Sequence, residues 1–400
     1  REHPEILVVG AGPAGSHAAR RLAEAGRSVR LLDENEGGRE DVVCTGIVGE
    51  EAWSEFDLPR AAVRDTIPAA RFVSPGGRVV RYDDGPLARV VDRTCFDDRL
   101  AERAARAGSE LCRGHAVREV AVDDEAVELR ARTADGEVRH RGRALVVATG
   151  HQRWLHEAAG LGTPDDYVHG VHLDVPFVDL EAAELYFGRD VAPGFFAWAV
   201  PYGGMARLGV LAEQGGRRWL ERFVRRPAIR DRMDGSVLEN GDLRAEVRSR
   251  GIVQGPVEPS VADRVVAVGE AAGQVKTTTA GGIYYGMIGA ELAAEVLDGA
   301  LATDRLDAAS LSAYEQAWRE RLGSEIEAGR ELQRVGAAMS DEEIDRLFGA
   351  LQDGFGAAVR EMIRFDWHRP ALRTLLGRKA PWREVVGRPL SALRSTVVSS

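Results

Sequence analysis

Short apolar runs alternate with amphipathic patterns in the first part of the chain. The run Ile6–Val9 predicts a buried strand, the alanine-rich stretch after it predicts a helix to about Ala25, and Ser28–Leu32 predicts a second strand. A glycine-rich turn separates the first strand from the helix. This order predicts a βαβ unit whose parallel strands are buried on both faces.

Further patterns extend this organisation. Apolar positions from Phe96 to Ala104 predict a helix that ends at Gly108, and alternating residues predict strands at Val117–Val122 and Ala126–Arg132. The stretch "RALVVATG" predicts another buried strand. From about Tyr167 the segments "YVHGVHLDVP", "FFAWAVP" and "ARLGVLAE" alternate and predict an antiparallel sheet.

The later part of the chain first contains another continuous apolar run, like the buried strands of the first domain, and then becomes helical. The stretch "DRVVAVGEAAG" predicts a strand that completes the first domain from a distance, and charged helical patterns prevail after Asp307. We therefore expect a discontinuous first domain at residues 1–165 and 255–300. An antiparallel-sheet substrate domain at 166–254 lies between its two parts, and a helical C-terminal region covers 301–400.

Composition narrows the classes of function. The 400 residues carry a net charge of -10 without a basic run, so we expect no nucleic-acid partner. Cys44, Cys95 and Cys112 are not spaced for a metal cluster, and His169 and His172 would lie on opposite faces of a strand, so we expect no metal site.

The same features predict a compartment. No uncharged stretch reaches the roughly 18–20 residues of a membrane span, and we expect no signal peptide ahead of the first strand. Unpaired cysteines fit a reducing compartment. We therefore expect a cytoplasmic protein, with peripheral membrane contact and the oligomeric state left open.

The glycine turn has the spacing Gly10-x-Gly12-x-x-Gly15 between a strand and a helix. The first glycine permits the tight turn, the second lets the backbone approach a pyrophosphate, and the third lets helix and strand pack closely. The helix N-terminus supplies free N–H groups, and Asp33 ends the second strand where a carboxylate can bind ribose hydroxyls. The turn therefore predicts a Rossmann-like dinucleotide-binding domain.

Longer motifs resemble a known family. The order of "GAGPAG", "DRTCFDDRLAERA", "VVATG" and "VGEAAG" is similar to that of FAD-dependent oxidoreductases of the hydroxylase and reductase group. More closely, "CTGIV", "FFAWAVPYG" and "GEAAGQVKTTTAGGIYYGM" resemble the geranylgeranyl reductase family, from Ile6 to about Leu297. The resemblance implies a flavoprotein that saturates isoprenoid double bonds in lipid biosynthesis.

The resemblance also implies which residues bind FAD. Arg93 would contact the flavin side of the cofactor, the Val117 backbone would meet the adenine, and Glu270 replaces the Asp that is usual there. The remaining cofactor-binding positions, by the same comparison, are Gly10, Gly12, Pro13, Ala14, Gly15, Asp33, Glu34, Thr45, Gly46, Gly150, Gly269 and Gly273.

The pair Gly281–Gly282 and Ile283 open a further helix in the last motif. By the resemblance, the amides of this helix start would face the pyrimidine edge of the isoalloxazine. A helix N-terminus stabilises negative charge there through its fixed dipoles, and a side chain would block the approach. The alternative is a flexible loop that only caps an ordinary helix.

Cys44 in "CTGIV" is the candidate catalytic residue, because family members carry a Cys followed closely by Gly against the flavin. Reduction of an isolated double bond needs a hydride on one carbon and a proton on the other, and a neutral thiol can donate that proton. The thiol could instead hold the substrate aside, or be a small buried hydrophobe. Cys95 and Cys112 are interpreted as packing residues.

The strand "FFAWAVPYG" is the candidate substrate-binding element. Phe196, Trp198 and Val200 alternate with alanines, so their side chains would share one face and line an apolar tunnel, and Pro201 would turn this face toward the flavin. The family usually has Tyr at the Phe196 position and Phe at the Val200 position, which leaves the length of the prenyl substrate open. A core-facing aromatic stripe is the alternative.

We therefore expect an FAD-dependent reductase of prenyl-type double bonds, with NAD(P)H, ferredoxin or a quinol as external reductant. A monooxygenase of aromatic or polyketide-like substrates is the first alternative, although "ATGHQRW" has Thr149 in place of the acid usual in hydroxylases. A halogenase would need a lysine in the N-terminal half, and the only lysines are Lys276 and Lys379. The second alternative, an electron-transfer flavoprotein, would generally carry a cysteine-ligated cluster.

Overall fold

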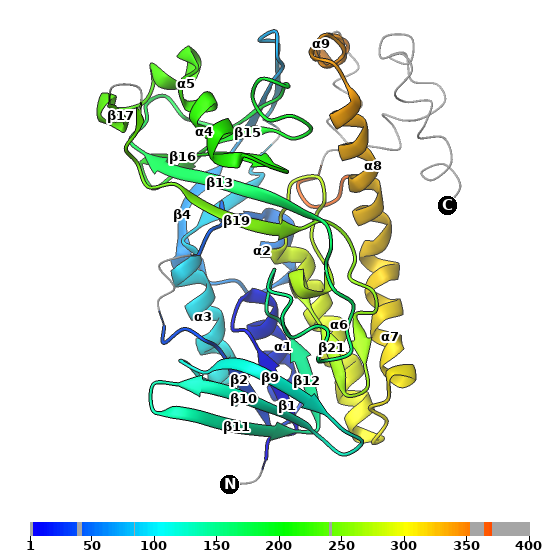
Figure 1. The fold of residues 1–400 in the computed structure, drawn as a ribbon. Coiled ribbons are helices and arrows are strands. Elements are labelled where there is room, and N and C mark those ends of the chain that lie inside the picture. The colour runs from blue at the N-terminus through cyan, green and yellow to red at the C-terminus, as the bar shows by residue number, and fades with distance from the viewer. Residues whose placement is uncertain (1–2, 38–41, 84, 240–241, 353–363, 370–400) are drawn as a thin grey trace.

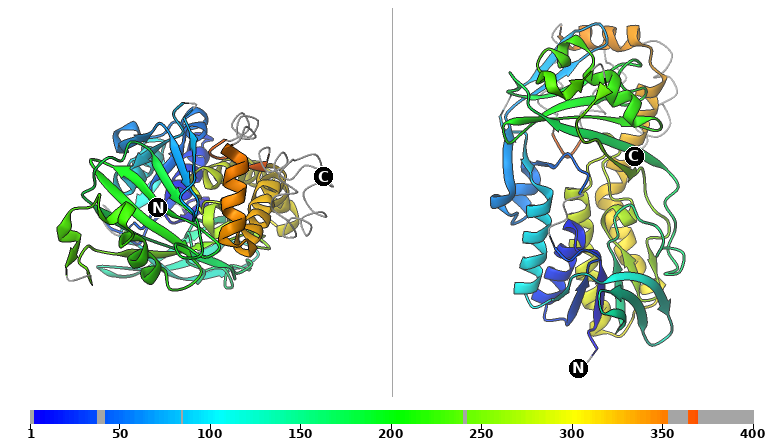
Figure 2. Two further views of the ribbon diagram at one scale, coloured as in Figure 1. Left: turned by 90° about the horizontal axis from the view of Figure 1, so that it is seen from above. Right: turned by 60° about the vertical axis from the view of Figure 1, so that its left-hand side comes forward.

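The computed structural model describes residues 3–37, 42–83, 85–239, 242–352 and 364–369. Lys379 lies outside these residues, as does most of the chain after residue 352 that was expected to be helical. Figures 1 and 2 show an elongated molecule with one large sheet near the N-terminus and a second at the opposite end. Helices connect the two along one side.

The first sheet has six strands in the order β20-β21-β12-β1-β2-β8. All neighbours are parallel except β20, which is antiparallel to β21. The late strands β20 and β21 lie beside β12, so a distant segment completes this sheet. The strands are β1 (Ile6–Val9), β2 (Val29–Leu32), β8 (Glu110–Cys112), β12 (Ala144–Val147), β20 (Val261–Ala262) and β21 (Val265–Ala267).

This sheet is buried on both faces, as its continuous apolar strands predict. Leu22, Phe96 and Leu297 pack on one face, while Val117 and Leu129 pack on the other. The first face is covered by α1 (Pro13–Glu24), α3 (Arg93–Arg106) and α6 (Ile283–Ala302), and the second by β9 (Ala116–Val122), β10 (Val127–Thr133) and β11 (Gly136–Gly142). The Rossmann-like architecture expected from the sequence is therefore confirmed.

The second sheet has seven strands in the order β19-β13-β16-β15-β14-β5-β6. Its neighbours are antiparallel except β14 and β5, which are parallel. β5 and β6 come from the part of the chain assigned by pattern to the first domain, and they extend one edge. The strands are β5 (Ala70–Val73), β6 (Val79–Tyr82), β13 (Tyr167–Val175), β14 (Ala183–Tyr186), β15 (Ala197–Tyr202), β16 (Met205–Ala212) and β19 (Arg248–Val253).

Smaller elements fill the space around the two sheets. Leu220 and Phe223 of α4 pack on one face of the seven-stranded sheet. The strands of a three-stranded sheet, β3-β7-β4, come between β2 and β8 of the first sheet in the chain. These elements are β3 (Ile47–Gly49), α2 (Glu50–Glu55), η1 (Arg60–Ala62), β4 (Val63–Ile67), β7 (Ala88–Val91), α4 (Gly216–Val224), α5 (Pro227–Arg230), η2 (Gly235–Val237), β17 (Leu238–Glu239), β18 (Asp242–Leu243) and η3 (Gly269–Ala272).

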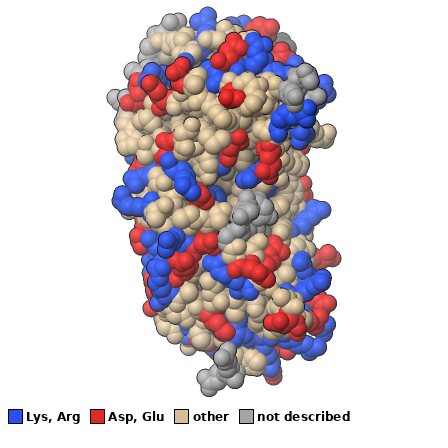
Figure 3. Space-filling view, turned by 90° about the vertical axis from the view of Figure 1, so that its left-hand side faces the viewer, with Lys and Arg blue, Asp and Glu red and all other residues tan. Residues whose placement is uncertain are grey.

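The C-terminal helices run from the first sheet to the second (Figure 1). α7 (Ala308–Trp318) continues through the π-helical segment η4 (Arg319–Gly323) into α8 (Ser324–Ala338), and α9 (Asp341–Ala350) follows. Ser340 and Glu343 form a capping box that starts α9. None of the helices in the described part of the chain combines the length and apolar composition that a bilayer-spanning helix requires. On the face shown in Figure 3, acidic and basic side chains are interspersed.

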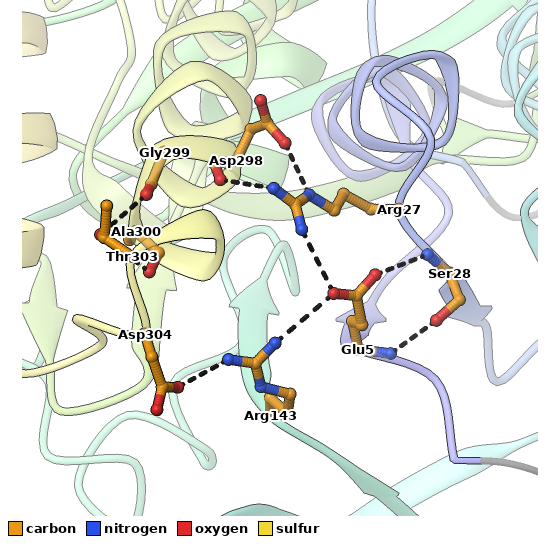
Figure 4. A network of polar contacts seen from close by, with 9 residues as sticks. All are labelled: Glu5, Arg27, Ser28, Arg143, Asp298, Gly299, Ala300, Thr303 and Asp304. Carbon is orange, nitrogen blue, oxygen red and sulfur yellow. Dashed lines mark hydrogen bonds and ion pairs between the residues drawn. The ribbon is translucent and has the colours of Figure 1, made fainter.

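A polar network joins the C-terminal ends of α1 and α6 (Figure 4). Arg27, just after α1, donates from Nε to the Asp298 carboxylate at 2.6 Å and from Nη2 to the Asp298 carbonyl at 2.8 Å. Its Nη1 lies 3.3 Å from the Glu5 carboxylate, which also pairs with Arg143 at 3.5 Å. The network therefore ties the first strand to the distant helix α6.

Replacement of Arg27 by Met should lower the free energy of unfolding by about 1–2 kcal/mol, because it breaks charged hydrogen bonds to two half-buried partners. Arg99→Met is the matched control, since it removes only an exposed pair with Glu102 and should cost less than about 0.5 kcal/mol. Chemical denaturation measures both values. Equal losses in the two variants would show that the network does not stabilise the fold.

Candidate active site

A single cavity of about 1160 Å³ extends from the six-stranded sheet to the seven-stranded sheet. This volume exceeds the ~300–1,000 Å³ of ordinary ligand pockets, which leaves room for a cofactor and a second molecule. All of the predicted cofactor-binding residues line it except Gly15 and Gly273. Cys44, Phe196, Trp198 and Val200 line it as well.

The glycine turn at the start of α1 fits a bound phosphate group. Gly10 has φ of 105°, and a Cβ there would lie 2.4 Å from the Ala148 carbonyl oxygen. A Cβ on Gly12 would meet no atom within 4 Å, so its backbone is open toward the cavity. Because Gly12 is the N-cap and offers no side-chain cap, the first amides of α1 are available to an anion.

Asp33 holds the glycine turn in place. One carboxylate oxygen accepts from the Ala11 amide at 2.7 Å, and the other accepts from the Asn35 amide and side chain at 2.9 and 2.7 Å. A carboxylate has about four acceptor sites, so about one remains for a ribose hydroxyl. The neighbouring Glu34 is exposed and also lines the cavity.

The second glycine pair meets the same cavity at the start of α6. A Cβ on Gly281 would lie 2.9 Å from Lys276 Cε, and one on Gly282 would lie 3.3 Å from Val275 Cγ2. The loop before α6 therefore folds closely against its own side chains at both glycines. Gly282 is the N-cap of α6 without a side-chain cap, so this helix also presents free amides.

Cys44 lies in the cavity wall just before β3, next to Arg93. The Gly46 amide donates to Cys44 Sγ at 3.3 Å. Arg93 binds both oxygens of Asp97 at 3.0 and 2.8 Å. Burial disfavours the Arg93 cation, but the Asp97 carboxylate and the Cys44 sulfur outweigh it and raise the pKa of Arg93. A fixed cation thus stands beside the thiol.

Arg207 of β16 joins the Cys44 loop to the seven-stranded sheet. Its Nη1 donates to the carbonyl oxygens of Cys44 at 2.7 Å and Thr45 at 3.1 Å. Its Nε and Nη2 donate to the Asp174 carboxylate at 2.7 and 2.8 Å, and its guanidinium stacks on the Tyr202 ring. The sequence patterns missed this residue, because nothing local indicates which distant loop a strand arginine contacts.

Glu270 at the start of η3 also contacts the second sheet. Its carboxylate forms an ion pair with Arg250 and accepts from the Val253 amide at 3.2 Å. Gly150 lies against both side chains, since a Cβ there would be 3.8 Å from each. The longer side chain of Glu, compared with Asp, therefore reaches β19. Arg250 was not predicted from the sequence.

Lys276 lies in the cavity wall as half of a buried ion pair. Its Nζ is 2.6 Å from Asp366 Oδ1, and it stacks over the Phe365 ring at 4.2 Å. The backbone carbonyl of Asp366 accepts from the Tyr285 hydroxyl at 2.8 Å. Residues 364–369 are thereby fastened to the start of α6.

Three predicted site residues do not line the cavity. Gly15 packs inward, since a Cβ there would lie 1.9 Å from the Gly10 carbonyl oxygen, and Gly273 ends η3 against the Gly255 carbonyl. Pro201 lies in β15, where alternation turns it away from the face shared by Trp198 and Val200. The lack of a side chain at Gly15 and Gly273 therefore allows two backbone segments to pack closely at each position.

The seven-stranded sheet provides an apolar wall. Phe72, Leu185 and Phe187 continue the surface begun by the β15 side chains. Leu332, Val335, Leu347 and Phe348 of α8 and α9 face it across the cavity. An elongated hydrocarbon could therefore lie between the sheet and these helices.

Comparison with known proteins identifies relatives of this chain. Residues 4–173 match the pyridine nucleotide-disulphide oxidoreductase family. The chain is 31% identical over 365 residues to digeranylgeranylglycerophospholipid reductase 2 of Methanothermobacter thermautotrophicus, covering 87% of this chain and 91% of the relative.

Solved structures share the fold. A geranylgeranyl bacteriochlorophyll reductase-like protein from Thermoplasma acidophilum has a TM-score of 0.83 and 20% identity, over 96% of this chain and 98% of its own. A flavin-dependent brominase has a TM-score of 0.72 and 18% identity, over 92% and 97%. The extent and identity of the match to the archaeal reductase show that this chain belongs to the geranylgeranyl reductase family of FAD-dependent oxidoreductases.

Proposed function

We propose that this protein uses FAD to reduce carbon–carbon double bonds in the prenyl chains of a lipid-type substrate. The observation that supports this best is the continuous cavity, which joins two helix N-termini and Cys44 to an apolar sheet face. The archaeal relative is named as a reductase of digeranylgeranylglycerophospholipid, a molecule of this class. NAD(P)H, ferredoxin or a quinol would be the external reductant.

The residues present fit FAD. The open backbone at Gly12 and the first amides of α1 would bind the pyrophosphate, and Asp33 or Glu34 the ribose. The start of α6 would bind the isoalloxazine. When bound and reduced, FAD supplies the hydride for saturation of a double bond.

The protein's own side chains would supply the proton and the shape of the site. We assign the proton to the Cys44 thiol, and the neighbouring Arg93 cation would stabilise the sulfur after the proton leaves. Arg207 fixes the backbone of Cys44 and Thr45 against the sheet that lines the substrate side. Hydride and proton would then reach adjacent carbons of the same chain.

An anaerobic assay separates this function from the alternatives. Dithionite-reduced enzyme should reoxidise when a geranylgeranyl lipid is added, and the mass of the lipid should rise by one hydrogen pair per reduced bond. Reoxidation that requires oxygen and yields a hydroxylated product would instead support the monooxygenase. Reoxidation only by a quinone, with no change in the lipid, would support electron transfer.

Replacement of Gly12 by Ala should weaken FAD binding by about tenfold or more, because the new methyl group projects into the space expected for the pyrophosphate. Stability of the FAD-free protein should not fall, since the methyl group contacts no protein atom. Gly299→Ala in α6, where a Cβ also meets nothing within 4 Å, is the control and should leave FAD binding unchanged. Flavin absorbance after dialysis measures the effect, and equal retention in both variants would contradict it.

Cys44→Ala should lower kcat for lipid reduction by about 100-fold or more with FAD still bound, because a general acid contributes about 10²–10⁴. Cys112→Ala, at the end of β8 and outside the cavity lining, should retain full activity. Single-turnover reoxidation of the reduced enzyme isolates this step. Unchanged turnover of Cys44→Ala would remove the thiol from the mechanism.

A further inference from the structure

A buried ion pair lies beside the start of α6, and the function proposed above does not use it. The side chains of Lys276 and Asp366 are 5% and 1% exposed, and Lys276 Nζ is 2.6 Å from Asp366 Oδ1. The same Nζ donates to the Phe365 carbonyl at 3.4 Å. Because both side chains are shielded from water, the electric field of each charge is weakened less than it would be at the surface.

The loop before α6 holds Lys276 against Gly281. The Lys276 amide donates to the Gly281 carbonyl at 3.0 Å, and the Ala280 amide donates to the Lys276 carbonyl at 2.8 Å. A Cβ on Gly281 would lie 2.9 Å from Lys276 Cε and 3.4 Å from its Nζ. The ammonium group therefore lies beside the residue that precedes the N-cap Gly282, and both glycines line the cavity.

Asp366 is attached to the same helix start. Its backbone carbonyl accepts from the hydroxyl of Tyr285, in the first turn of α6, at 2.8 Å. Its side chain also contacts β3, since a Cβ on Gly49 would collide with Asp366 Oδ2. A cation and a carboxylate are therefore held next to the amides that would face the isoalloxazine.

Two other titratable side chains adjoin the pair. Burial and the Lys276 cation lower the pKa of His368 to about 4, so its ring is neutral near pH 7 and adds no charge. Burial and the Asp366 carboxylate raise the pKa of Glu51, which is half-buried. Replacement of Lys276 or Asp366 would thus change the charge beside the helix start directly.

Charge near the isoalloxazine affects how readily a bound flavin is reduced. Reduction adds negative charge near the pyrimidine edge, so a nearby cation favours the reduced form and a nearby carboxylate favours the oxidised form. Coulomb forces act over several ångströms in a buried site and need no direct contact. The two members of the ion pair would therefore act on the flavin in opposite directions.

Building on the proposed function, we propose that Lys276 raises the reduction potential of the bound flavin and that Asp366 lowers it. Both are positioning residues that act through their charge. A higher potential makes reduction by the external donor more favourable but makes hydride transfer to the double bond less favourable, so the pair balances the two half-reactions. Because residues 364–369 provide the carboxylate, the C-terminal part of the chain takes part in setting the potential.

An anaerobic spectroscopic titration of the holoenzyme, which gives the midpoint potential without any lipid, tests this inference. Asp366→Asn keeps the shape of the side chain but removes its charge. It should favour reduced over oxidised FAD by about tenfold relative to wild type, or about 30 mV for a two-electron couple. Adding Lys276→Met to Asp366→Asn removes the cation without leaving a buried carboxylate unpaired, and the potential should fall back by a similar amount.

Arg27→Met is the matched control. It removes a cation that binds Asp298 near the other end of α6, about 22 Å along the helix from Ile283, and should leave the potential as in wild type. Equal potentials in wild type, Asp366→Asn and the double variant would overturn the inference, and would mean that the pair only fastens residues 364–369.

Asp366→Ala also removes the charge and serves as the second test if Asp366→Asn does not retain FAD. Loss of FAD from both variants would give the pair a purely structural role and overturn the inference. A wild type that binds no FAD would instead contradict the proposed function. Because the titration uses no lipid, the expected potentials without reduction of a lipid would contradict the proposed function and leave this inference supported.

Discussion

The close approach of α1 and α6 is the constraint on which the cavity depends. A Cβ on Gly286 of α6 would lie 3.4 Å from Ala14 Cβ in α1 and 3.1 Å from Gly269 Cα in η3, and a Cβ on Gly269 would lie 2.8 Å from Ala14 Cβ. Glycine at positions 269 and 286 thus keeps the starts of the two helices close together. At the far ends of the helices, Arg27 binds both the carboxylate and the carbonyl of Asp298. Two helix N-termini from opposite parts of the chain therefore open into one cavity, where their dipoles can act on one cofactor.

The two sheets are coupled by buried charges at the cavity wall. Arg207 connects the Cys44 loop to β13 through Asp174, and Glu270 connects η3 to β19 through Arg250. A buried cation is tolerated only when its donors are matched, and Arg207 satisfies this with a carboxylate, two carbonyls and an aromatic face. The residue proposed to donate the proton is thus positioned by the sheet that forms the apolar wall of the cavity.

Regular, strongly patterned elements could be predicted from the sequence. The strand Ile6–Val9 has the predicted bounds, and the helix after it ends at Glu24, one residue before the prediction. The patterns missed β11 and the strands between residues 47 and 91. Several of these strands are only half buried, so their apolar alternation is weak, and their partners are distant in sequence. Most of the site residues predicted from the motifs line the cavity, because a glycine turn and a helix start have local signatures.

The sequence by itself determined the α/β architecture, the glycine turns and their helices, and the family, since each depends on local spacing or on long motifs. Only the tertiary structure decided which charges meet across the cavity: Arg207 with the Cys44 loop, Arg250 with Glu270, and Lys276 with Asp366. It also placed His172 and Trp198 on the same face of the seven-stranded sheet, on either side of Gly209. Pairings of this kind depend on strand register and on how distant segments cross. The periodicity of one segment contains no information about its distant partner.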